Sequence, residues 1–326
     1  MKNMAAQIPI EQAFSRILEH AGLAPVERVS LNDALGCVLA EEVKADRDWP
    51  PFNRSMVDGY AVFSNDTRSA PDVLEVIEEV PAGKQATRAL APGQAIKIMT
   101  GAPVPAGADA VVMQERTGIP RAGFVTVQMM MKPGQNVSKR GEDARAGQDV
   151  IASGTTLTPA EIGVLAAVGY DQVPVRKTPL VAILGTGNEL VEPGETPRAE
   201  QIRNSNSYQL LAQCKARQFR TRYLGIARDD RDQTLRLLEE GLKADVLVST
   251  GGISVGEFDF VGASLKQLGV EIYFDKIAVK PGKPTTFGRR RETLVFGLPG
   301  NPVAAFVCFH LFTLTAIRAR MGLKDP

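Results

Sequence analysis

"ADVLVSTGGISVGEFDF", residues 244–260, places a short apolar run directly before a glycine-rich loop and a predicted helix. The run Val246–Val248 contains no polar side chain, which is typical of a strand buried on both faces of a sheet. Two adjacent glycines, two small hydroxyls and two acids follow where this strand ends. A plain connection needs one or two such residues, so the excess indicates a ligand on the loop.

The same order of strand, loop and helix repeats from residue 179 onward. Apolar strands that alternate with amphipathic helices predict a three-layer α/β domain, with a doubly wound and mostly parallel sheet covered on both faces. Ligands of such sheets bind beyond the carboxyl ends of the strands. Before this region, a helix is predicted from Pro159, with Thr158 as its cap and Glu161 completing a capping box.

The first half of the chain follows a different pattern. Residues 10–18 place apolar side chains on one helical face, and a second short helix is predicted after Ser30, its cap. From Val43 to about Val137, short apolar runs alternate with turns rich in proline and glycine. This pattern predicts an all-β module, either a barrel-like sheet or a small sandwich.

The composition limits the classes of function. The 326 residues predict two or three domains, and a formal net charge of +1 from 38 basic and 37 acidic residues disfavours nucleic-acid binding. The three cysteines lack the spacing of a zinc site or a disulfide framework. Residues 1–14 have no signal-peptide pattern, and no apolar run reaches roughly twenty residues. We therefore expect a cytoplasmic protein that does not cross a membrane.

Four polar loops fall at predicted strand ends, and main-chain N–H groups beside glycines can approach an anion closely. Any one loop is more often an ordinary tight turn, but four at one predicted edge indicate a phosphate-bearing ligand. The sequence contains neither the dinucleotide-binding fingerprint nor a P-loop. The candidate ligand-binding residues are Gly185, Thr186, Gly187, Thr250, Gly251, Gly252, Ser254, Pro299, Gly300 and Asn301.

Charged side chains recur in the same loops. A lone loop acid is usually solvated or caps a helix, but a set of acids beside a phosphate site more often holds Mg²⁺, which takes oxygen ligands. Lys280 and Lys283 flank a Pro-Gly turn that would let both ammonium groups face one oxyanion, whereas Lys276 either joins them or is a surface lysine. The acids are Glu189, Asp229, Asp230, Glu257 and Asp259.

Three polar residues stand out in the first half. Asp58 and Thr100 each precede a glycine, and Asp143 follows the segment Lys139–Glu142. Each is a plausible β-turn residue, since Asp-Gly is a strong hairpin signal. Sequence spacing alone does not connect them to the loops of the second half.

Seven motifs occur in the order seen in the MoeA family of molybdopterin molybdenumtransferases, which includes the E domains of gephyrin and of the plant Cnx enzymes. The resemblance extends from about residue 7 to residue 321. The motifs are SMVDGYAV, MTGAPVPAGADAVV, KRGED, GTGNEL, STGGISVGEFD, VKPGKP and GLPGNPV.

The resemblance implies a homodimer whose active cleft lies between the α/β domain of one subunit and the first domains of its partner. Such a cleft would bring Asp58, Thr100 and Asp143 to the loops. Family members usually continue into a C-terminal β domain, which this chain is expected to lack. The implied parts are an N-terminal helix in residues 1–26, a linking domain in 27–50 and 138–175, an inserted β-rich domain in 51–137, and a molybdopterin-binding α/β domain in 176–326.

The implied reaction replaces the adenylyl group of adenylyl-molybdopterin by molybdenum, with molybdate as second substrate, Mg²⁺ as cofactor and AMP as product. The molybdopterin adenylyltransferase is a further expected partner. Catalysis is assigned by resemblance to Asp58, Thr100, Asp143, Glu189, Asp229, Asp259, Lys276 and Lys280. Molybdate would be bound by Lys280, Lys283 and Pro284, and Mg²⁺ by Glu189, Asp229 and Asp259.

Two residues depart from the family pattern. Asn188 stands where relatives commonly have an aspartate, so one potential cation ligand is neutral. Ala304 stands where many have a serine, so a hydroxyl that could contact molybdate is missing.

Three alternatives compete with this resemblance. A molybdopterin adenylyltransferase has a similar α/β fold and loop, but that family lacks the β-rich insertion and the Asp58 and Asp143 motifs. A gephyrin-like scaffold without catalysis would need a receptor-binding or linker segment, and none is visible. A nucleotide-amidase-associated domain with the same α/β core leaves residues 51–145 unexplained.

Overall fold

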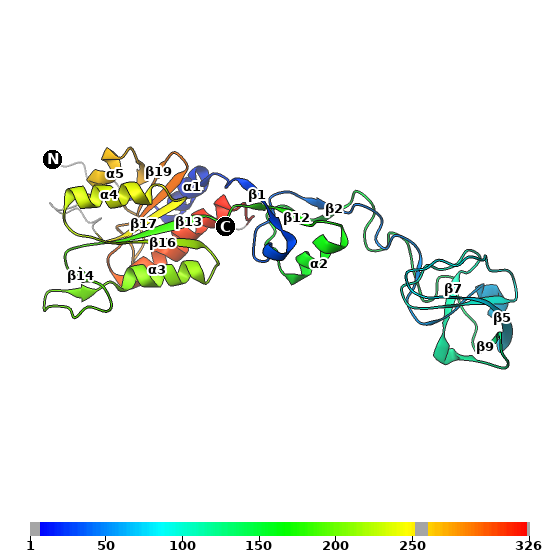
Figure 1. The fold of residues 1–326 in the computed structure, drawn as a ribbon. Coiled ribbons are helices and arrows are strands. Elements are labelled where there is room, and N and C mark those ends of the chain that lie inside the picture. Colours follow the sequence, from blue (N-terminus) through cyan, green and yellow to red (C-terminus); the bar gives the residue numbers. More distant parts are fainter. Residues whose placement is uncertain (1–6, 252–259, 325–326) are drawn as a thin grey trace. The chain divides into compact units, whose positions relative to one another are not determined.

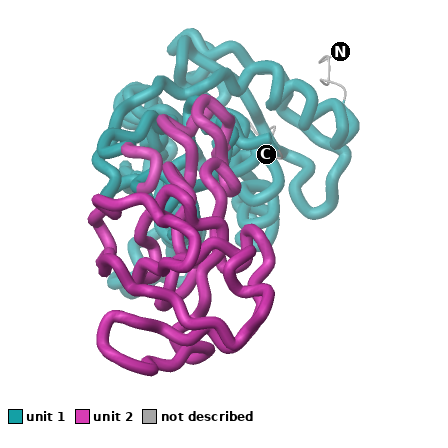
Figure 2. The backbone as a smooth tube through the Cα atoms, turned by 90° about the vertical axis from the view of Figure 1, so that its right-hand side faces the viewer, with its two compact units in different colours: residues 1–41, 152–166, 170–326 teal, residues 42–151, 167–169 magenta. Residues whose placement is uncertain are grey.

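The computed structural model describes residues 7–251 and 260–324, which form two compact units (Figures 1 and 2). Unit 1 comprises residues 1–41, 152–166 and 170–326, and unit 2 comprises residues 42–151 and 167–169. Unit 1 is α/β and unit 2 is almost entirely β.

A six-stranded mixed sheet forms the centre of unit 1. Its strands lie in the order β16 (Arg220–Ala227), β13 (Leu180–Thr186), β17 (Val246–Thr250), β20 (Thr293–Leu298), β19 (Thr286–Arg290) and β18 (Glu271–Phe274). The first four strands are parallel to one another, while β19 and β18 are each antiparallel to their neighbours. The predicted α/β fold is therefore confirmed, and its sheet has an antiparallel pair of strands at one edge.

Helices cover both faces of this sheet (Figure 1). Successive residues of β13 face opposite layers: Val181 and Ile183 belong to one core cluster, and Ala182 and Leu184 to the other. The second cluster is covered by α4 (Arg231–Gly241) and α5 (Phe260–Gln267). The first is covered by α1 (Ile10–Ala21), α3 (Ser205–Lys215), α6 (Pro302–Cys308), the π-helix η4 (Phe309–Thr313) and α7 (Leu314–Arg320).

The continuous helical stretch Pro302–Arg320 has the length and apolar composition of a membrane-spanning helix, but half of it is buried inside the protein. Phe309, Phe312 and Ile317 have no exposed surface and belong to the core of unit 1. Packing against the sheet therefore accounts for its apolar composition.

The second predicted helix, after Ser30, is wrong. Residues of β1 (Val26–Ser30) pair antiparallel with β12 (Gln172–Arg176), and only a single 3₁₀ turn, η1 (Leu31–Asp33), follows. Further along, the Leu39 N–H donates to the Thr155 carbonyl at 2.9 Å. The main-chain N–H and C=O groups that would form helical hydrogen bonds here bond instead to residues far away in the sequence. Local helix propensity does not reveal such long-range pairing.

The helix α2 (Pro159–Ala167) begins as predicted. The Thr158 N–H donates to Oε2 of Glu161 at 2.9 Å, and the Ala160 N–H donates to Oγ1 of Thr158 at 3.3 Å. These two bonds satisfy N–H groups that a helix N-terminus leaves without main-chain partners. The capping box is therefore confirmed.

Unit 2 contains a second six-stranded sheet. Its two edge strands, β7 and β8, are joined by one short 3₁₀ turn, η3 (Gln114–Arg116), so the opposite edges of the sheet lie close together. The sheet is therefore strongly curved, and the barrel-like expectation is confirmed in this form. Its strand order is β7 (Ala110–Met113), β4 (Gly59–Val62), β6 (Gln94–Ile98), β5 (Asp72–Val80), β9 (Phe124–Val127) and β8 (Thr117–Gly118).

Shorter elements complete unit 2. A 3₁₀ turn, η2 (Ser64–Thr67), follows β4. Two additional antiparallel pairs lie outside the six-stranded sheet. They are β2 (Val43–Lys44) with β11 (Asp149–Ile151), and β3 (Arg54–Ser55) with β10 (Val137–Ser138).

Candidate functional site

The carboxyl ends of β13, β16, β17 and β20 meet at one edge of the unit 1 sheet, because these four strands are parallel. The loops selected from the sequence therefore lie side by side there, as far as the structure describes them. Three hydrogen bonds join neighbouring loops: Gly187 N–H to Ala227 O at 3.0 Å, Thr186 Oγ1 to Thr250 O at 3.0 Å, and Gly251 N–H to Leu298 O at 3.1 Å.

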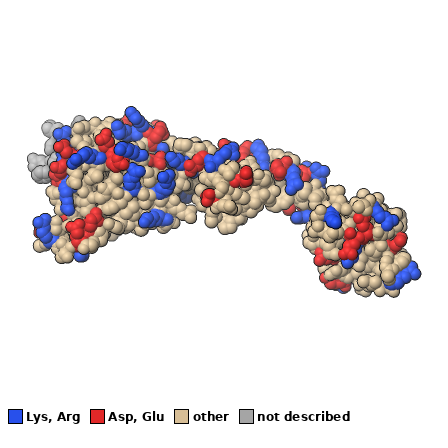
Figure 3. All heavy atoms as spheres, in the orientation of Figure 1, with Lys and Arg blue, Asp and Glu red and all other residues tan. Residues whose placement is uncertain are grey.

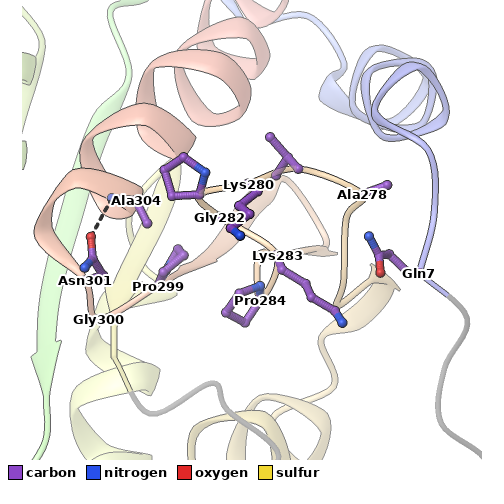
Figure 4. Close-up of a pocket in the computed structure, with 12 residues that line it drawn as sticks. Gln7, Ala278, Lys280, Gly282, Lys283, Pro284, Pro299, Gly300, Asn301 and Ala304 are labelled. Atoms are coloured by element: carbon purple, nitrogen blue, oxygen red, sulfur yellow. Dashed lines mark hydrogen bonds between the residues drawn. The ribbon is translucent and has the colours of Figure 1, made fainter.

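The larger cavity at this end of unit 1 has a volume of about 820 Å³ (Figure 4). Lys280 and Lys283 rise from one of its loops, and the turn that follows β20 forms the opposite wall. Both lysine side chains are exposed, and none of the described residues that line the cavity is acidic. Six predicted residues line it, namely Lys280, Lys283, Pro284, Pro299, Gly300 and Asn301.

A buried glycine holds the lysine-bearing loop against α6. Gly282 has a φ of +122°, and a Cβ added there would overlap Sγ of Cys308 and lie 3.2 Å from Cγ1 of Val279. The hydroxyl of Thr285 donates to the Gly282 carbonyl at 2.7 Å. Burial also raises the pKa of the Cys308 thiol, so it packs as a neutral group. Lys280 and Lys283 are thus carried by a turn that only glycine can complete at this distance from the helix.

Lys276 is not among the residues that line this cavity. Its side chain is half-buried, and its carbonyl accepts a hydrogen bond from the Ile8 N–H at 3.2 Å. The same pairing, a parallel bridge between Ile8 and Ile277, brings Gln7 to the cavity wall (Figure 4). Sequence reasoning missed Gln7, because nothing local indicates that residues 8 and 277 pair.

Asn301 and Ala304 meet at the start of α6. Oδ1 of Asn301 accepts from the Ala304 N–H at 3.1 Å, which makes Asn301 the helix cap (Figure 4). Ala304 itself lines the cavity, so this position contributes a methyl group and no hydroxyl to the wall.

A second, smaller cavity of about 60 Å³ adjoins the first, and Gly300 lines both. Three residues selected from the sequence, Thr186, Thr250 and Gly251, line it. Its other wall, Ile202–Asn206, was missed by sequence reasoning, although the cap signal was present. Oδ1 of Asn204 accepts from the Ser207 N–H at 3.1 Å and caps α3, which starts at Ser205.

The predicted Mg²⁺ ligands are only partly described. Glu189 and Asp229 are exposed on adjacent loops, which Asn188 links because its Oδ1 accepts from the Asp229 N–H at 3.0 Å. Within residues 7–251 and 260–324, no three His, Cys, Asp or Glu side chains are grouped closely enough to hold a metal ion. Gly252, Ser254, Glu257 and Asp259 lie outside the described residues, so the Mg²⁺ site stays a prediction.

Asp230 has a structural role. Its Oδ1 accepts from the Gln233 N–H at 2.6 Å, so it is the cap of α4. A carboxylate at a helix N-terminus also interacts favourably with the helix dipole. The helix-capping interpretation weighed for the loop acids therefore holds for this residue.

In unit 2, Asp58 and Thr100 lie together. Oδ1 of Asp58 accepts from both the hydroxyl and the N–H of Thr100, each at 2.7 Å. These two bonds, the hydroxyl bond first, hold the pKa of the Asp58 carboxyl below its usual range. Gly59 begins β4 and does not form a hairpin turn; a Cβ there would overlap the Val112 carbonyl of β7. Close strand packing, not turn geometry, explains the Asp-Gly pair.

Asp143 is exposed in the same unit and has a different neighbour. Its Oδ2 lies 3.9 Å from the guanidinium of Arg54. Such an exposed pair is held only weakly in water. Asp143 is therefore available to an approaching cation or polar ligand.

Acidic and basic side chains are mixed over the surface (Figure 3). No large area of a single sign is visible on the face of either unit drawn there. This mixture agrees with the formal net charge of +1.

Two family models match the chain. The first, described as the MoeA N-terminal region (domain I and II), covers residues 8–169. The second, described as a probable molybdopterin binding domain, covers residues 182–319. Together they include both units and the loops at the carboxyl edge of the sheet in unit 1.

Relatives match along nearly the whole chain. A molybdopterin molybdenumtransferase of Bacillus subtilis is 40% identical over 98% of this chain and 76% of its own length. One of Staphylococcus aureus is 35% identical over 98% of this chain and 77% of its own length. The solved structure of the MoeA molybdopterin biosynthesis protein from Pyrococcus horikoshii has a TM-score of 0.83 and 33% identity, covering 98% of this chain and 81% of that one. The chain therefore belongs to the MoeA family of molybdopterin molybdenumtransferases.

Proposed function

We propose that this chain inserts molybdenum into molybdopterin, using adenylyl-molybdopterin and molybdate as substrates and releasing AMP. The names of its relatives associate the family with molybdenum cofactor biosynthesis. The observation that supports the proposal most is the cavity of about 820 Å³ that is lined by Lys280 and Lys283 on one loop and by the turn Pro299–Asn301 on another. It combines a cationic loop with a neutral, glycine-containing wall.

Charge supports molybdate as the ligand of this cavity. Molybdate carries two negative charges, and the two ammonium groups of Lys280 and Lys283 would offset them. A lysine ammonium is a compact charge, which suits a small tetrahedral oxyanion better than a broad guanidinium does. Pro284 and the buried Gly282 fix the loop, so the lysines need little reorganisation when the anion binds.

The reaction balances without a further reactant. The two dithiolene thiols of the substrate displace one oxo group of molybdate, which leaves as water and takes both thiol protons. One water is consumed when the phosphoanhydride bond is cleaved. Its oxygen atom ends either on the phosphate of AMP or on the phosphate of the pterin. The net products are the molybdenum-loaded pterin and AMP.

The acidic residues in the loops at the carboxyl edge of the sheet suit Mg²⁺ chemically. Glu189 and Asp229 offer carboxylate oxygens, the ligand type that Mg²⁺ prefers, and Asp259 would be the third ligand. When bound, Mg²⁺ would neutralise negative charge on phosphate oxygens. The protein's own contribution is the pairing of Asn188 with the Asp229 N–H, which fixes the two acid-bearing loops relative to each other.

The smaller cavity and its glycine loops would bind the phosphate-bearing part of the substrate. Thr186, Thr250 and Gly251 line this cavity at strand ends. The Thr186 hydroxyl and the Gly251 N–H already donate to main-chain carbonyls, so the phosphoryl contacts would come mainly from the glycine-rich loop that follows. Gly185 and Gly187 complete this group in our proposal. Gly252 and Ser254 would extend it from the part of the loop outside the described residues.

We also propose a cytoplasmic homodimer in which Asp58, Thr100 and Asp143 of one subunit complete the site of its partner, with Lys276 in a supporting role. Mixed dimers test this directly. Asp58→Ala and Lys283→Ala protomers, each inactive alone, should regain activity on mixing, because half of the sites in a mixed dimer are intact. Monomers with full activity would contradict it. The molybdopterin adenylyltransferase remains a proposed further partner.

The division into domains is part of the same proposal. Residues 138–175 would join residues 27–50 as the linking domain, and residues 51–137 would be the inserted β-rich domain. The α/β domain would comprise residues 176–326, together with the N-terminal helix in residues 1–26.

Mass spectrometry of the products tests the proposed reaction. Purified chain, adenylyl-molybdopterin and Mg²⁺ should yield AMP and molybdenum-loaded pterin in equal amounts when molybdate is present. Formation of adenylyl-molybdopterin from ATP and molybdopterin would instead identify an adenylyltransferase. If the folded protein forms neither product, the proposal is overturned.

A further inference from the structure

A small lobe beside the smaller cavity is tied to the sheet by one carboxylate. The lobe, residues 190–203, contains the parallel pair β14 (Leu190–Val191) and β15 (Ile202–Arg203). Glu192 of the lobe accepts two hydrogen bonds, one on each oxygen. The donors are the hydroxyl of Tyr223 to Oε1 at 2.7 Å and the hydroxyl of Tyr208 to Oε2 at 2.9 Å.

The two tyrosines differ in burial and in their other hydrogen bonds. Tyr223, on β16, also accepts a hydrogen bond on its hydroxyl oxygen from Nδ2 of Asn204 at 2.8 Å. Tyr208, on α3, is exposed, and its hydroxyl has only the bond to Glu192 among the contacts of the described residues. Burial first, and the bond to Glu192 second, raise the pKa of Tyr223, so it remains a protonated donor at neutral pH.

Asn204 connects this pair to the cavity. It is 1% exposed, its Oδ1 caps α3, and its main-chain N–H donates to the Val191 carbonyl at 2.9 Å. Two residues later, Nδ2 of Asn206 donates to the Gly300 carbonyl at 2.8 Å. Asn204, Asn206 and Gly300 all line the smaller cavity.

The end of β13 closes against the same cap. A Cβ added at Gly185 would lie 3.0 Å from Nδ2 of Asn204 and 3.2 Å from Oγ of Ser207. Asn204 therefore has little room to move, and rotation of its amide would lose the bond to Tyr223 and press on the strand. The orientation of the cavity wall depends on keeping this amide in place.

We propose that Glu192 and Tyr223 are positioning residues that act through Asn204 to set the α3 wall of the smaller cavity and, through Asn206, the Gly300 turn. Neither residue lines the cavity itself, so the effect is on geometry and not on ligand contact. The inference that this geometry serves adenylyl-molybdopterin rests on the proposed function. The hydrogen-bond relay itself does not.

Two tyrosine variants form a matched pair. Tyr223→Phe and Tyr208→Phe each remove one hydroxyl and one bond to Glu192, but only Tyr223→Phe also leaves the amide of buried Asn204 without its partner. We expect Tyr223→Phe to raise the KM for adenylyl-molybdopterin about tenfold, the cost of about one unsatisfied buried group, with a smaller change in kcat. Tyr208→Phe should change KM less than twofold.

A conservative variant separates geometry from charge. Glu192→Gln keeps an acceptor for the Tyr223 hydroxyl and should stay within about twofold of the wild type. Glu192→Ala should raise KM more than Glu192→Gln but less than Tyr223→Phe, because the Tyr223 hydroxyl oxygen still accepts from Asn204. Equal effects of the two tyrosine variants, or a loss in Glu192→Gln as large as in Glu192→Ala, would overturn the relay.

Hydrogen exchange tests the relay without turnover. In Tyr223→Phe, main-chain N–H groups of residues 190–206 should exchange faster than in Tyr208→Phe, while those of β17 should be unchanged. If exchange is faster in Tyr223→Phe but the wild-type protein transfers no molybdenum, the proposed function is rejected and the relay stands. Unchanged exchange and an unchanged KM in Tyr223→Phe would reject the relay alone.

Discussion

Replacing Gly282 by alanine should be among the most damaging single methyl additions in the α/β unit. The residue has a φ of +122°, and the added Cβ would overlap Sγ of Cys308. A non-glycine residue in such a backbone conformation costs about 1–3 kcal/mol, and forcing a methyl group into a well-packed site costs about 1–3 kcal/mol more. We therefore expect Gly282→Ala to lower the free energy of unfolding by about 2–6 kcal/mol.

Urea unfolding measures this loss, and Gly163→Ala is the control. Gly163 lies in α2 with nothing within 4 Å of an added Cβ and without a positive φ, so the same methyl group should be neutral or stabilising there. Combining Gly282→Ala with Cys308→Ala removes the overlapping sulfur. The double variant should recover about 1–3 kcal/mol relative to additivity, while the backbone cost remains.

The same variant should also affect molybdate binding, because Lys280 and Lys283 flank the altered residue. The molybdate concentration for half-maximal AMP release should rise, whereas Gly163→Ala should leave it unchanged. Strict additivity of Gly282→Ala and Cys308→Ala, or a Gly282→Ala protein as stable as the wild type, would refute the packing argument for this loop.

Three further predictions concern the polar residues. Lys280→Arg should raise the half-saturating molybdate concentration about tenfold in an AMP-release titration, because a broad guanidinium replaces a compact ammonium; an unchanged value would remove Lys280 from the site. Asn188→Asp keeps an acceptor for the Asp229 N–H and adds a carboxylate, so it should lower the Mg²⁺ concentration needed for activity, and an increased requirement would contradict this. Thr100→Val removes the hydroxyl that most lowers the pKa of Asp58. A carboxyl with a lowered pKa stabilises the folded state above its usual titration range, and this stabilisation is lost as the pH falls through the lowered pKa. In Thr100→Val, the NMR titration midpoint of the Asp58 carboxyl should therefore move to higher pH. An unmoved midpoint would show that the main-chain bond alone lowers the pKa of Asp58.

The layered α/β fold was predictable because its signals are local. Strands such as Val246–Thr250 have continuous apolar runs, and the capping box at Thr158 fixes a helix start within four residues. The antiparallel direction of β19 was not predictable, since a buried strand has the same composition in either direction. The failed helix after Ser30 has the same origin, because its main chain bonds to residues more than a hundred positions away.

The candidate site shows the same division. Lys280 and Lys283 were found because four residues of sequence define their turn, and both line one cavity. Gln7 was missed because its position depends on the pairing of Ile8 with Ile277, which lie far apart in the sequence. Asn206 was missed because the sequence shows an amide but not the Gly300 carbonyl to which it donates.

Gly300 forms part of the wall of both cavities, and its carbonyl accepts a hydrogen bond from the Asn206 amide of α3. Any ligand that shifts this turn from one side changes the free energy of binding on the other side. Because the free energies around a closed cycle sum to zero, the influence must be equal in both directions. If bound molybdate strengthens the binding of the pterin substrate, the bound pterin substrate strengthens the binding of molybdate by the same factor. The two reactants would then bind together tightly, although each binds weakly alone.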